Sequence, residues 1–393
     1  MTIDVVQEKF CDQPRFQTVF MHLGEPGSRR LLATPALVCD LDALDQNIDT
    51  MASVARDASI ALRPHVKSHK GAFVAARQLR AGAVGLAFVK LSEAEIVIEQ
   101  LPALGYHDRV SALLTSPLVG ASLAERAWQL AEHCDLAVVA DSPEGIDELD
   151  DAARGDAELR VLCDVDVGQG RTGVTSAAAA LRLADRLHDS RRLLFGGVQG
   201  YAGNHQHVHG RQERRERIAV STERLRVIIS ALEEAGHDVP LRSGGGTGSA
   251  LIDIELGVLN ELQCGSYVFM DREYRDALGD DPEGRFAQSL TIDATVISTN
   301  HESHVTIDAG LKSMATDAGA PVVVGHETSI AYHFQGDEHG RLDAPREAFG
   351  RGDRVSLIPP HCDPTVNLYD VIWMVRGDTV VDAAWVVARG CSQ

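Results

Sequence analysis

The sequence contains very little lysine. Only five of its 37 basic residues are lysines, so arginine supplies most of the positive charge. With 57 acidic residues, the formal net charge is −20 at pH 7. So strong a negative field leaves no dominant basic surface, which excludes nucleic acid or an anionic membrane as the partner. Two of the five lysines, Lys67 and Lys70, fall within the eight residues "RPHVKSHK" (63–70).

The seven cysteines form no pattern of a disulfide or zinc scaffold. Their number is odd and no C-x-x-C pair occurs, which favours a reduced, cytoplasmic protein. No apolar run approaches the ~20 residues that cross a bilayer. Residues 1–16 also lack the charged and apolar regions of a signal peptide. The 393 residues, 44% of them hydrophobic, suffice for one large barrel and a second domain.

Short apolar runs alternate with helical patterns from about residue 35 to residue 271. The runs begin with "ALVCDL" (36–41) and continue through segments such as "CDLAVVAD" and "LRVLCDVDV". Between the first two runs, Leu44, Ile48, Met51 and Ala55 share one helical face. About eight β/α units in this length predict a (β/α)8 barrel. A doubly wound open sheet is the alternative, because periodicity does not reveal closure.

The pattern changes after residue 272. A polar connection is followed by runs such as "SLTIDATVIS" and "VIWMVRGDTVVDAAWVVARG", with no long helix between them. These runs predict a mostly β domain. We therefore expect three parts: an N-terminal segment over 1–32 that packs on the β domain, a barrel over 33–271, and a β-rich domain over 272–393.

"RPHVKSHK" follows the apolar run "SIAL" and so is expected at the active end of a barrel strand. A lysine becomes a nucleophile when burial or nearby cations lower its pKa. Arg63, His65 and Lys70 are close enough in sequence to supply such cations. The alternative is a solvated basic loop.

Two glycine-rich segments suggest a phosphate site. "SGGGTGS" (243–249) follows the strand-like "VPLR", and "QCGSYVFMD" (263–271) ends the next run. Adjacent late-strand loops with glycines and hydroxyls are the usual phosphate site of such a barrel, although two ordinary turns would look the same. "VDVGQGRTGV" contains a formal GxGxxG, but its position favours a loop that presents Arg171 over a dinucleotide fingerprint.

Two further segments carry histidines. "YAGNHQHVHG" (201–210) contains Tyr201 and three histidines two residues apart, which could be metal ligands, a base or a polar turn. "PPHCDPTVNLYD" contains His361 and Asp363 around Cys362. A His-x-Asp pair places two ligands on one side of an extended segment and leaves room for water or substrate oxygens. Such a pair also occurs by chance.

Together, in this order and spacing, these motifs resemble the D-threonine aldolases, the D-3-hydroxyaspartate aldolases and the eukaryotic-type D-serine dehydratases. The resemblance runs from about residue 33 to the C-terminus. It is carried by "RPHVKSHK", "GQGRTGV", "YAGNHQH", "GGGTGS", "QCGSYVFMD", "DAGLKSMATDAG", "GDEHG" and "HCDPTVNLYD". The family consists of fold-type III pyridoxal phosphate enzymes with an alanine-racemase-like barrel and a β-rich C-terminal domain. The resemblance implies a closed barrel, pyridoxal 5'-phosphate as cofactor, and a homodimer.

The resemblance also implies residue roles. Lys67 matches the lysine that holds the cofactor covalently, with Lys70 as its neighbour. Gln263 falls where the pyridine nitrogen is contacted, and His207 matches a histidine proposed for acid/base work. The implied catalytic residues are Lys67, His207, Arg171 and Tyr201. The implied cofactor-binding residues are Lys67, Arg171, Tyr201, Thr247, Gly248, Gln263, Gly265 and Ser266.

His361 and Asp363 match the two protein ligands of a divalent cation. Dehydratase members resemble His-x-Cys and bind zinc, whereas this sequence has aspartate two residues after the histidine. Because a carboxylate favours harder cations, Mn²⁺ or Mg²⁺ is expected over Zn²⁺. The aldolase branch is therefore the better match.

The implied activity is a metal-dependent lyase that cleaves a small D-β-hydroxy-α-amino acid of the D-threonine type. A retro-aldol reaction would release glycine and an aldehyde, with His207 or a metal-bound hydroxide as the base. One alternative is a dehydratase acting on D-serine or D-3-hydroxyaspartate. Another is a cofactor-holding protein without turnover, which the β domain and the His-x-Asp pair disfavour. A metal hydrolase on a barrel is the most distant alternative.

Overall fold

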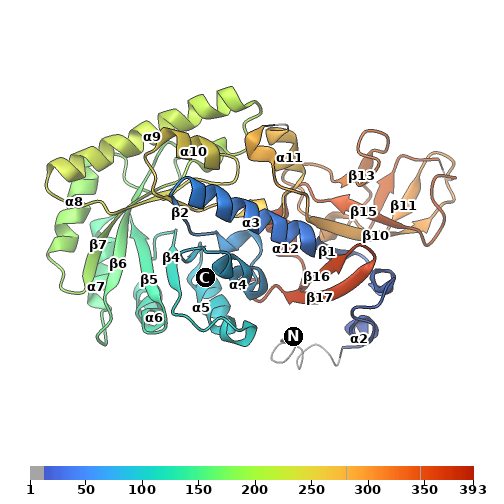
Figure 1. The fold of residues 1–393 in the computed structure, drawn as a ribbon, viewed down its shortest axis with the longest axis horizontal. Helices are drawn as coiled ribbons and strands as arrows, with labels where there is room; N and C mark the ends of the chain where they lie inside the picture. Colours follow the sequence, from blue (N-terminus) through green and yellow to red (C-terminus); the bar gives the residue numbers. More distant parts are fainter. Residues whose placement is uncertain (1–12, 280, 346) are drawn as a thin grey trace.

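The computed structural model describes residues 13–279, 281–345 and 347–393. Within this part of the chain, two sheets form: one of eight parallel strands and one of nine strands that is mostly antiparallel. Figure 1 shows the parallel sheet and its helices on the left and the second sheet on the right. Of the N-terminal segment expected over 1–32, residues 1–12 lie outside the described residues.

The parallel sheet is a barrel with the order β2-β9-β8-β7-β6-β5-β4-β3. Its inner strands are buried almost throughout, which explains why they read as continuous apolar runs rather than alternating ones. Its strands are β2 (Ala61–Leu62), β3 (Leu86–Phe88), β4 (Ser111–Leu114), β5 (Asp135–Ala140), β6 (Leu159–Val165), β7 (Leu193–Gly200), β8 (Leu241–Gly244) and β9 (Glu261–Leu262).

The two ends of this sheet meet and close the ring. His65, just beyond β2, forms a parallel bridge with Ala87 of β3. Two backbone hydrogen bonds reinforce it, from the Val84 N–H to the Leu62 carbonyl and from the Ala87 N–H to the Pro64 carbonyl, both 2.9 Å long. "RPHVKSHK" therefore lies at the seam of the barrel.

Helices cover the outside of the barrel (Figure 1). Helix α3 is capped by the Asp40 carboxylate, which accepts a hydrogen bond from the Ala43 N–H at 2.9 Å. Its predicted apolar face is confirmed, since Leu44, Ile48 and Met51 are buried. The helices are α3 (Leu41–Asp57), α4 (Ala72–Arg80), α5 (Leu91–Gln100), α6 (Ala121–Ala131), α7 (Pro143–Asp151), α8 (Ala177–His188), α9 (Arg211–Glu234) and α10 (Ala250–Leu256).

Strand β1 (Ala36–Asp40) is not part of the barrel, so the expectation that "ALVCDL" is its first strand is wrong. β1 pairs antiparallel with β10 and parallel with β16 in the second sheet. Four of its five residues are buried there, as they would be in a barrel. The same apolar run is therefore compatible with either sheet, and its pairing with strands far along the chain determines which sheet it joins.

The second sheet forms the β domain. β10 is its centre, because it pairs with β1, β11 and β15. Besides β1, the strands are β10 (Leu290–Ser298), β11 (Val305–Ile307), β12 (Val322–Val323), β13 (Tyr332–Phe334), β14 (Gly340–Leu342), β15 (Arg354–Ile358), β16 (Val371–Arg376) and β17 (Thr379–Trp385). Two short helices, α11 (Arg272–Leu278) and α12 (Cys362–Val366), accompany the sheet.

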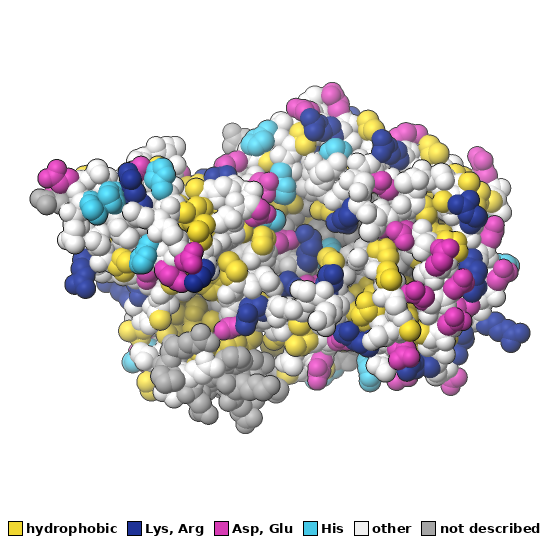
Figure 2. Space-filling model, turned by 180° about the vertical axis from the view of Figure 1, so that it is seen from behind, with side chains coloured by type: hydrophobic (Ala, Val, Ile, Leu, Met, Phe, Trp, Pro, Cys, Tyr) yellow, Lys and Arg dark blue, Asp and Glu magenta, His cyan; other side chains and the backbone are white. Residues whose placement is uncertain are grey.

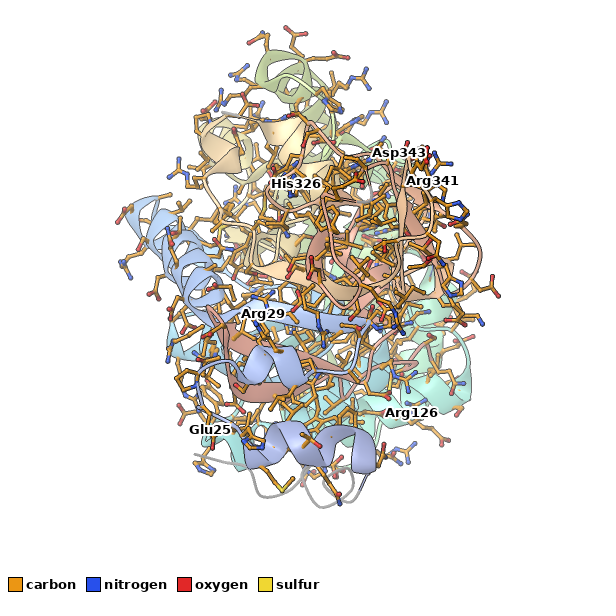
Figure 3. The ribbon with its side chains drawn as sticks, turned by 90° about the vertical axis from the view of Figure 1, so that its right-hand side faces the viewer. Glu25, Arg29, Arg126, His326, Arg341 and Asp343 are labelled. Carbon is orange, nitrogen blue, oxygen red and sulfur yellow. The ribbon has the colours of Figure 1, made fainter. Side chains whose placement is uncertain are left out.

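The described part of the N-terminal segment lies against this sheet. Helix α2 (Pro14–Met21) places the Phe16 ring 5.8 Å from Trp373 and 5.7 Å from Trp385. Figure 3 labels Arg29, whose Nε donates to the Asp293 carboxylate of β10 at 2.7 Å. Near the other end of the same sheet, Arg341 and Asp343 form a half-buried ion pair (Figure 3).

Asp271 joins the barrel to the β domain. One of its carboxylate oxygens caps α11 by accepting from the Tyr274 N–H at 2.9 Å. The other accepts from the Cys362 N–H at 2.8 Å, and the Arg272 N–H donates to the Pro359 carbonyl at 3.0 Å. This buried connection holds the start of α12 above the active end of the barrel.

Acidic and basic side chains are interspersed over the face of the molecule in Figure 2. No described helix combines the length and apolarity needed to cross a membrane.

Candidate active site

A cavity of about 250 Å³ opens at the carboxyl end of the barrel strands. This is where a barrel of parallel strands places its reactive groups, because the following loops converge there. Fifteen residues line it: His65, Lys67, Val89, Thr115, Ser116, Arg171, Thr172, Gln199, Tyr201, Gly246, Thr247, Gln263, Gly265, Ser266 and Tyr274.

Lys67 projects into this cavity from the short 3-10 helix that follows β2. Its Nζ donates a hydrogen bond of 2.7 Å to Oδ2 of Asp363, which lies 296 residues later on α12. Attraction to Asp363 outweighs burial and raises the pKa of Lys67 above its ordinary value. Burial acts in the opposite direction on Asp363, but the charges of Lys67 and His361 hold the pKa of that carboxyl well below its usual range.

The expectation that neighbouring cations lower the pKa of Lys67 is therefore wrong in this structure. Arg63 pairs with Glu261 at 2.9 Å, and Lys70 pairs with Glu93 on α5. Burial and the Lys67 charge lower the pKa of His65 well below its ordinary value, so this ring is neutral. Each candidate cation is neutralised by a partner or uncharged, and Asp363 dominates the field at Lys67.

The two glycine-rich loops meet at one wall of the cavity. The Tyr267 N–H donates to the Thr247 hydroxyl at 3.0 Å, which ties the two loops together. Within the described chain, no hydrogen-bond acceptor faces the backbone N–H groups of Thr247, Gly265 or Ser266. Buried amides without partners are costly unless a ligand accepts from them. A phosphate fits this cradle.

Glycine is required in this wall for lack of space. A Cβ on Gly265 would lie 2.4 Å from the Ser68 hydroxyl, and one on Gly246 would lie 2.5 Å from the Gln206 amide oxygen. Gly248 does not line the cavity. Its N–H donates to Oε1 of Gln206 at 3.0 Å, so it supports the cradle from behind.

Gln263 lines the cavity and is bonded directly to neutral groups. Its amide nitrogen donates to the Gln199 amide oxygen at 3.1 Å and to the Ser243 hydroxyl at 2.9 Å. The Ser243 hydroxyl in turn donates to Glu261 at 2.6 Å. Because its partners fix the amide group, Gln263 presents its oxygen edge and no full charge to any ligand in the cavity.

Arg171 and Tyr201 share another wall. The Arg171 guanidinium lies 5.7 Å from the centre of the Tyr201 ring. Burial raises the pKa of the Tyr201 phenol, so it is protonated at neutral pH and can act as a hydrogen-bond donor.

His207 lies outside the cavity lining and contacts Tyr274, which is part of it. The two ring centres are 4.2 Å apart, and Nδ1 of His207 is 3.6 Å from the Glu273 carboxylate. Its Nε2 is buried without a hydrogen-bond partner in the described residues. Burial and the neighbouring His361 lower the pKa of His207 to about 4, so the imidazole is neutral at pH 7.

His361 and Asp363 stand at the beginning of α12, on the same side as the Lys67 ammonium. Nδ1 of His361 is 2.7 Å from the Asp317 carboxylate, which leaves Nε2 as the nitrogen available to a cation. A carboxylate on the far nitrogen of a metal-binding histidine is a common arrangement. No described group of three His, Cys, Asp or Glu side chains forms a complete metal cage.

Cys362, between these two residues, is fully buried and faces the protein. Its thiol donates to Oδ1 of Asp363 at 3.3 Å, and burial raises the pKa of the thiol well above its ordinary value. A buried, protonated thiol is a poor ligand, so the imidazole and the carboxylate are the donors that fit a cation here.

Several residues of the site have no sequence signal of their own. Tyr274, Thr115 and Gln199 line the cavity. They come from α11, from the residue after β4 and from β7, outside the motifs that the sequence suggests. Asp317 lies within "DAGLKSMATDAG", where nothing in the spacing marks it as a partner of His361. Only the folded chain brings these residues together.

Comparison with known proteins places the chain in a family. Residues 39–273 match the family described as alanine racemase, N-terminal domain, and residues 289–375 match a serine dehydratase domain. A D-threonine aldolase from Arthrobacter sp is 38% identical over 379 residues, covering 94% of this chain and 96% of the relative. This chain belongs to the D-threonine aldolase family.

Other members of the D-threonine aldolase family agree with this assignment. A 3-hydroxy-D-aspartate aldolase from Paracoccus denitrificans (strain Pd 1222) is 34% identical, with 91% of this chain and 92% of the relative covered. The crystal structure of D-threonine aldolase from Filomicrobium marinum superimposes with a TM-score of 0.87 at 35% identity, covering 93% and 98% of the two chains. The predicted family and the predicted fold, an alanine-racemase-like barrel followed by a mostly β domain, are confirmed.

Proposed function

We propose that this protein is a lyase that depends on pyridoxal 5'-phosphate and a divalent cation. It cleaves D-β-hydroxy-α-amino acids of the D-threonine type into glycine and an aldehyde. The observation that carries the proposal is the 2.7 Å contact between Lys67 of the barrel and Asp363 of the β domain. It brings an amine that can hold the cofactor next to a carboxylate that can hold a cation. The names of the similar proteins support the same activity.

Lys67 would hold the cofactor covalently, and the amides of Thr247, Gly265 and Ser266 would hold its phosphate. Gln263 would face the pyridine ring, with Arg171 and Tyr201 at its rim. When bound, pyridoxal phosphate supplies an electron sink for the carbanion that forms when the Cα–Cβ bond breaks. A neutral amide at Gln263 fits this role without a full charge beside the ring.

His361 and Asp363 would hold the cation, with Asp317 orienting His361 through Nδ1. A bound Mn²⁺ or Mg²⁺ supplies Lewis-acid polarisation of the substrate's β-hydroxyl. Two protein ligands leave positions open for water and substrate oxygens, as a catalytic metal site requires.

The chain's own residues would handle the protons. His207 is neutral at pH 7, and its Nε2 has no hydrogen-bond partner among the described residues, so it can accept the β-hydroxyl proton once the ring reaches the substrate. The Tyr201 phenol, protonated at this pH, can donate to an oxygen in the cavity. Asp363 keeps the returning Lys67 amine close to the cavity.

A product assay tests the proposal. The protein, supplied with pyridoxal phosphate and Mn²⁺, is mixed with D-threonine, and glycine, acetaldehyde and 2-oxobutyrate are measured. We expect glycine and acetaldehyde in equal amounts, loss of turnover with EDTA, and recovery with Mn²⁺. L-threonine serves as the control and should give neither product.

The alternative activity is dehydration, which the match of residues 289–375 to a serine dehydratase domain keeps open. In that case D-threonine yields only 2-oxobutyrate, and the aldolase proposal is wrong. Inactivity towards every D-β-hydroxy amino acid, with or without metal, would instead support a cofactor-holding protein without turnover.

A further inference from the structure

The segment that carries His207 has almost no regular structure of its own. Between the end of β7 and the start of α9, residues 201–210 contain only a short 3-10 helix, Gly203–His205. A segment that lacks the regular backbone hydrogen bonds of a helix or strand is held in place by its contacts with neighbouring parts of the chain. The groups that hold it therefore decide where the His207 ring lies.

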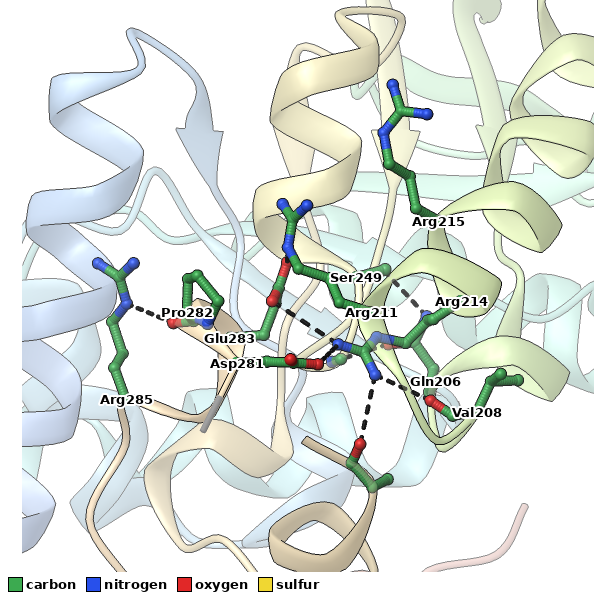
Figure 4. Close-up of polar contacts among 12 residues, drawn as sticks. Gln206, Val208, Arg211, Arg214, Arg215, Ser249, Asp281, Pro282, Glu283 and Arg285 are labelled. Atoms are coloured by element: carbon green, nitrogen blue, oxygen red, sulfur yellow. Dashed lines mark hydrogen bonds and ion pairs between the residues drawn. The ribbon is translucent and has the colours of Figure 1, made fainter. Parts of the chain in front are cut away.

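Arg214, in the first turn of α9, bonds to this segment (Figure 4). Its side chain is fully buried. Nη1 donates to the Val208 carbonyl at 2.8 Å and to the Ala277 carbonyl at 3.4 Å, while Nη2 donates to the Asp281 carboxylate at 2.7 Å. One guanidinium thus bonds the His207 segment, the end of α11 and the turn that follows α11.

Two of these stretches define the surroundings of His207. Val208 follows it directly in the sequence, so the bond to the Val208 carbonyl fixes the backbone at His207. Ala277 belongs to α11, the helix whose Tyr274 ring packs on the imidazole and whose Glu273 carboxylate lies 3.6 Å from Nδ1. Arg214 therefore sets the distance between the imidazole and the helix that orients it.

Gln206 fixes the segment on the other side of His207. Its amide nitrogen donates to the Ser249 hydroxyl at 3.0 Å (Figure 4), and its oxygen accepts from the Gly248 N–H. These bonds attach the segment to the glycine-rich loop. His207 thus lies between one residue attached to the loop of the expected phosphate site and another attached to Arg214.

Stability alone does not account for Arg214. The charge is balanced by Asp281 and by Glu283, which is also paired with Arg211 at 3.2 Å. Such a buried ion pair can often be replaced at little cost to stability when both partners become apolar, whereas removing one partner alone is strongly destabilising. A planar guanidinium, however, bonds two carbonyls and a carboxylate from two separate nitrogens in a rigid fork, whereas a lysine offers its donors from a single point and an apolar side chain offers none.

We propose that Arg214 is a positioning residue: it holds the loop that carries His207 and helix α11 in fixed relative positions, so that the His207 ring stays packed on Tyr274 at the edge of the cavity, next to the reacting atoms. The proposal rests on the proposed function only in treating His207 as the base. The positioning itself is a property of the fold.

The test compares Arg214→Lys and Arg214→Met with the wild type, all as the metal-loaded holoenzyme. A matched control is Arg109→Lys. Arg109 also bonds backbone carbonyls (Ala131 and Cys134) and a carboxylate (Asp135), but near the amino ends of β4 and β5, away from the cavity. A shift of about 1 Å in a catalytic group can cost on the order of 100-fold in rate. We expect kcat to fall by roughly 10- to 100-fold in both Arg214 variants, with KM and cofactor absorbance unchanged, and no change in Arg109→Lys.

A second readout does not require turnover. The ring of His207 is followed by NMR with ¹³C-labelled histidine, its signal assigned by its absence from His207→Gln. In the wild type its resonance should carry the ring-current shift of the packed Tyr274 ring, 4.2 Å away. In Arg214→Met the loosened ring should move away from Tyr274, and its resonance should shift towards that of a solvent-exposed histidine. If Arg214→Met does not fold, Asp281→Asn loosens the same guanidinium from a partly exposed site and should shift both readouts in the same direction, less strongly.

Wild-type kcat and an unshifted His207 signal in a folded Arg214 variant, or in Asp281→Asn where the Arg214 variants do not fold, would overturn the proposal. If the wild type has no retro-aldol activity, the proposed function fails, and the NMR comparison alone decides whether Arg214 positions His207. The failures of the two proposals are thus distinguishable.

Discussion

The inner and outer halves of the cavity are built from different chemistry. The inner half comes from the barrel and consists of backbone amides, hydroxyls and carboxamides at Thr247, Ser266, Gln263 and Gln199. The outer half joins Lys67 to the His361–Asp363 pair from α12 and is dominated by opposite charges. In the inner half, hydrogen bonds within the barrel fix neutral donors. In the outer half, the Lys67 charge on the barrel faces the Asp363 charge on α12.

This difference indicates a division of labour. A group held by neutral, prearranged amides is bound without a change in protonation, which suits a permanent cofactor. Charged groups that pair with one another, as Lys67 and Asp363 do, must exchange partners when substrate or metal binds, which suits the chemical step. Asp271 connects α12 of the β domain to the barrel. Through this connection His361 and Asp363 add charged groups to a cavity that the barrel lines mostly with neutral ones.

The largest effect is expected from Lys67→Ala, which removes the cation of the outer half. The cofactor's visible absorbance and the turnover should both be abolished, because no amine remains to hold the cofactor. Absorbance spectroscopy after gel filtration measures this. Lys70→Ala is the control: it should keep the absorbance but lose about 3–5 kcal/mol of stability, since Glu93 would be left buried and unpaired. An essential Lys70 and a dispensable Lys67 would reverse the assignment.

A smaller effect is expected from Asp317→Asn, which tests whether the outer half holds a cation. Loss of the carboxylate on Nδ1 should weaken Mn²⁺ binding by roughly 10- to 100-fold, while the cofactor absorbance should not change. Electron paramagnetic resonance of free Mn²⁺ measures the affinity. Asp337→Asn, an exposed residue paired with Lys312, is the matched control. Equal Mn²⁺ affinity in the two variants would remove Asp317 from the site.

A further test concerns the inner half. Thr247→Ala leaves the buried Tyr267 N–H without its acceptor, which costs about 1–3 kcal/mol. Cofactor affinity should fall about tenfold, equivalent to about 1.4 kcal/mol. Thr247→Ser retains the hydroxyl and should behave like the wild type in fluorescence titration with pyridoxal phosphate. Equal loss in both variants would show that the hydroxyl does not matter.

The smallest effect on the reaction is expected from Asp253→Asn, behind the glycine-rich loop. Burial raises the pKa of the Asp253 carboxyl to about 7, above its ordinary value of 3.8. Between these values the folded chain holds a proton that the unfolded chain releases, so wild-type stability decreases as pH rises from about 4 through 7, by about 1.4 kcal/mol per pKa unit. Asparagine does not titrate and keeps an acceptor for Ser249.

Tm measured at pH 5 and pH 8 checks this prediction. Asp253→Asn should lose less stability over this range than the wild type, whereas the exposed Asp49→Asn control should match the wild type. If Tm changes with pH to the same extent in all three proteins, Asp253 is charged at both pH values. The inner half of the cavity would then rest on a buried negative charge.

Much of the fold could be predicted from the sequence because it depends on local patterns. The apolar face of α3 and the serine and proline that open α7 follow from periodicity and capping, which act within a few residues. After residue 272 the sequence changes from alternating apolar runs and helical patterns to strand-like runs without a long helix, and this change similarly predicts the second, β-rich part. The wrong assignment of Ala36–Asp40 shows the limit, since a run buried on both faces suits either sheet.

The candidate site was predictable only in part. The motifs indicate which residue types carry chemistry, and the structure brings Lys67, Thr247, Gln263, Gly265 and Ser266 around one cavity. The electrostatics were not predictable, because sequence neighbours of Lys67 turn to other partners while Asp363 arrives from far along the chain. Charge acts over distance in space, and sequence separation does not report that distance.

By itself, the sequence determined the class of chain: a β/α barrel followed by a β-rich domain, with a lysine at a strand end and two glycine-rich loops. These features depend on local propensity and composition. Only the tertiary structure decided that β1 leaves the barrel, that Lys67 meets a carboxylate rather than cations, and that Arg214 holds the His207 loop against α11. Each of these features depends on contacts between distant parts of the chain. Local sequence does not distinguish the possible partners, and burial and hydrogen bonding in the folded chain determine which of them pair.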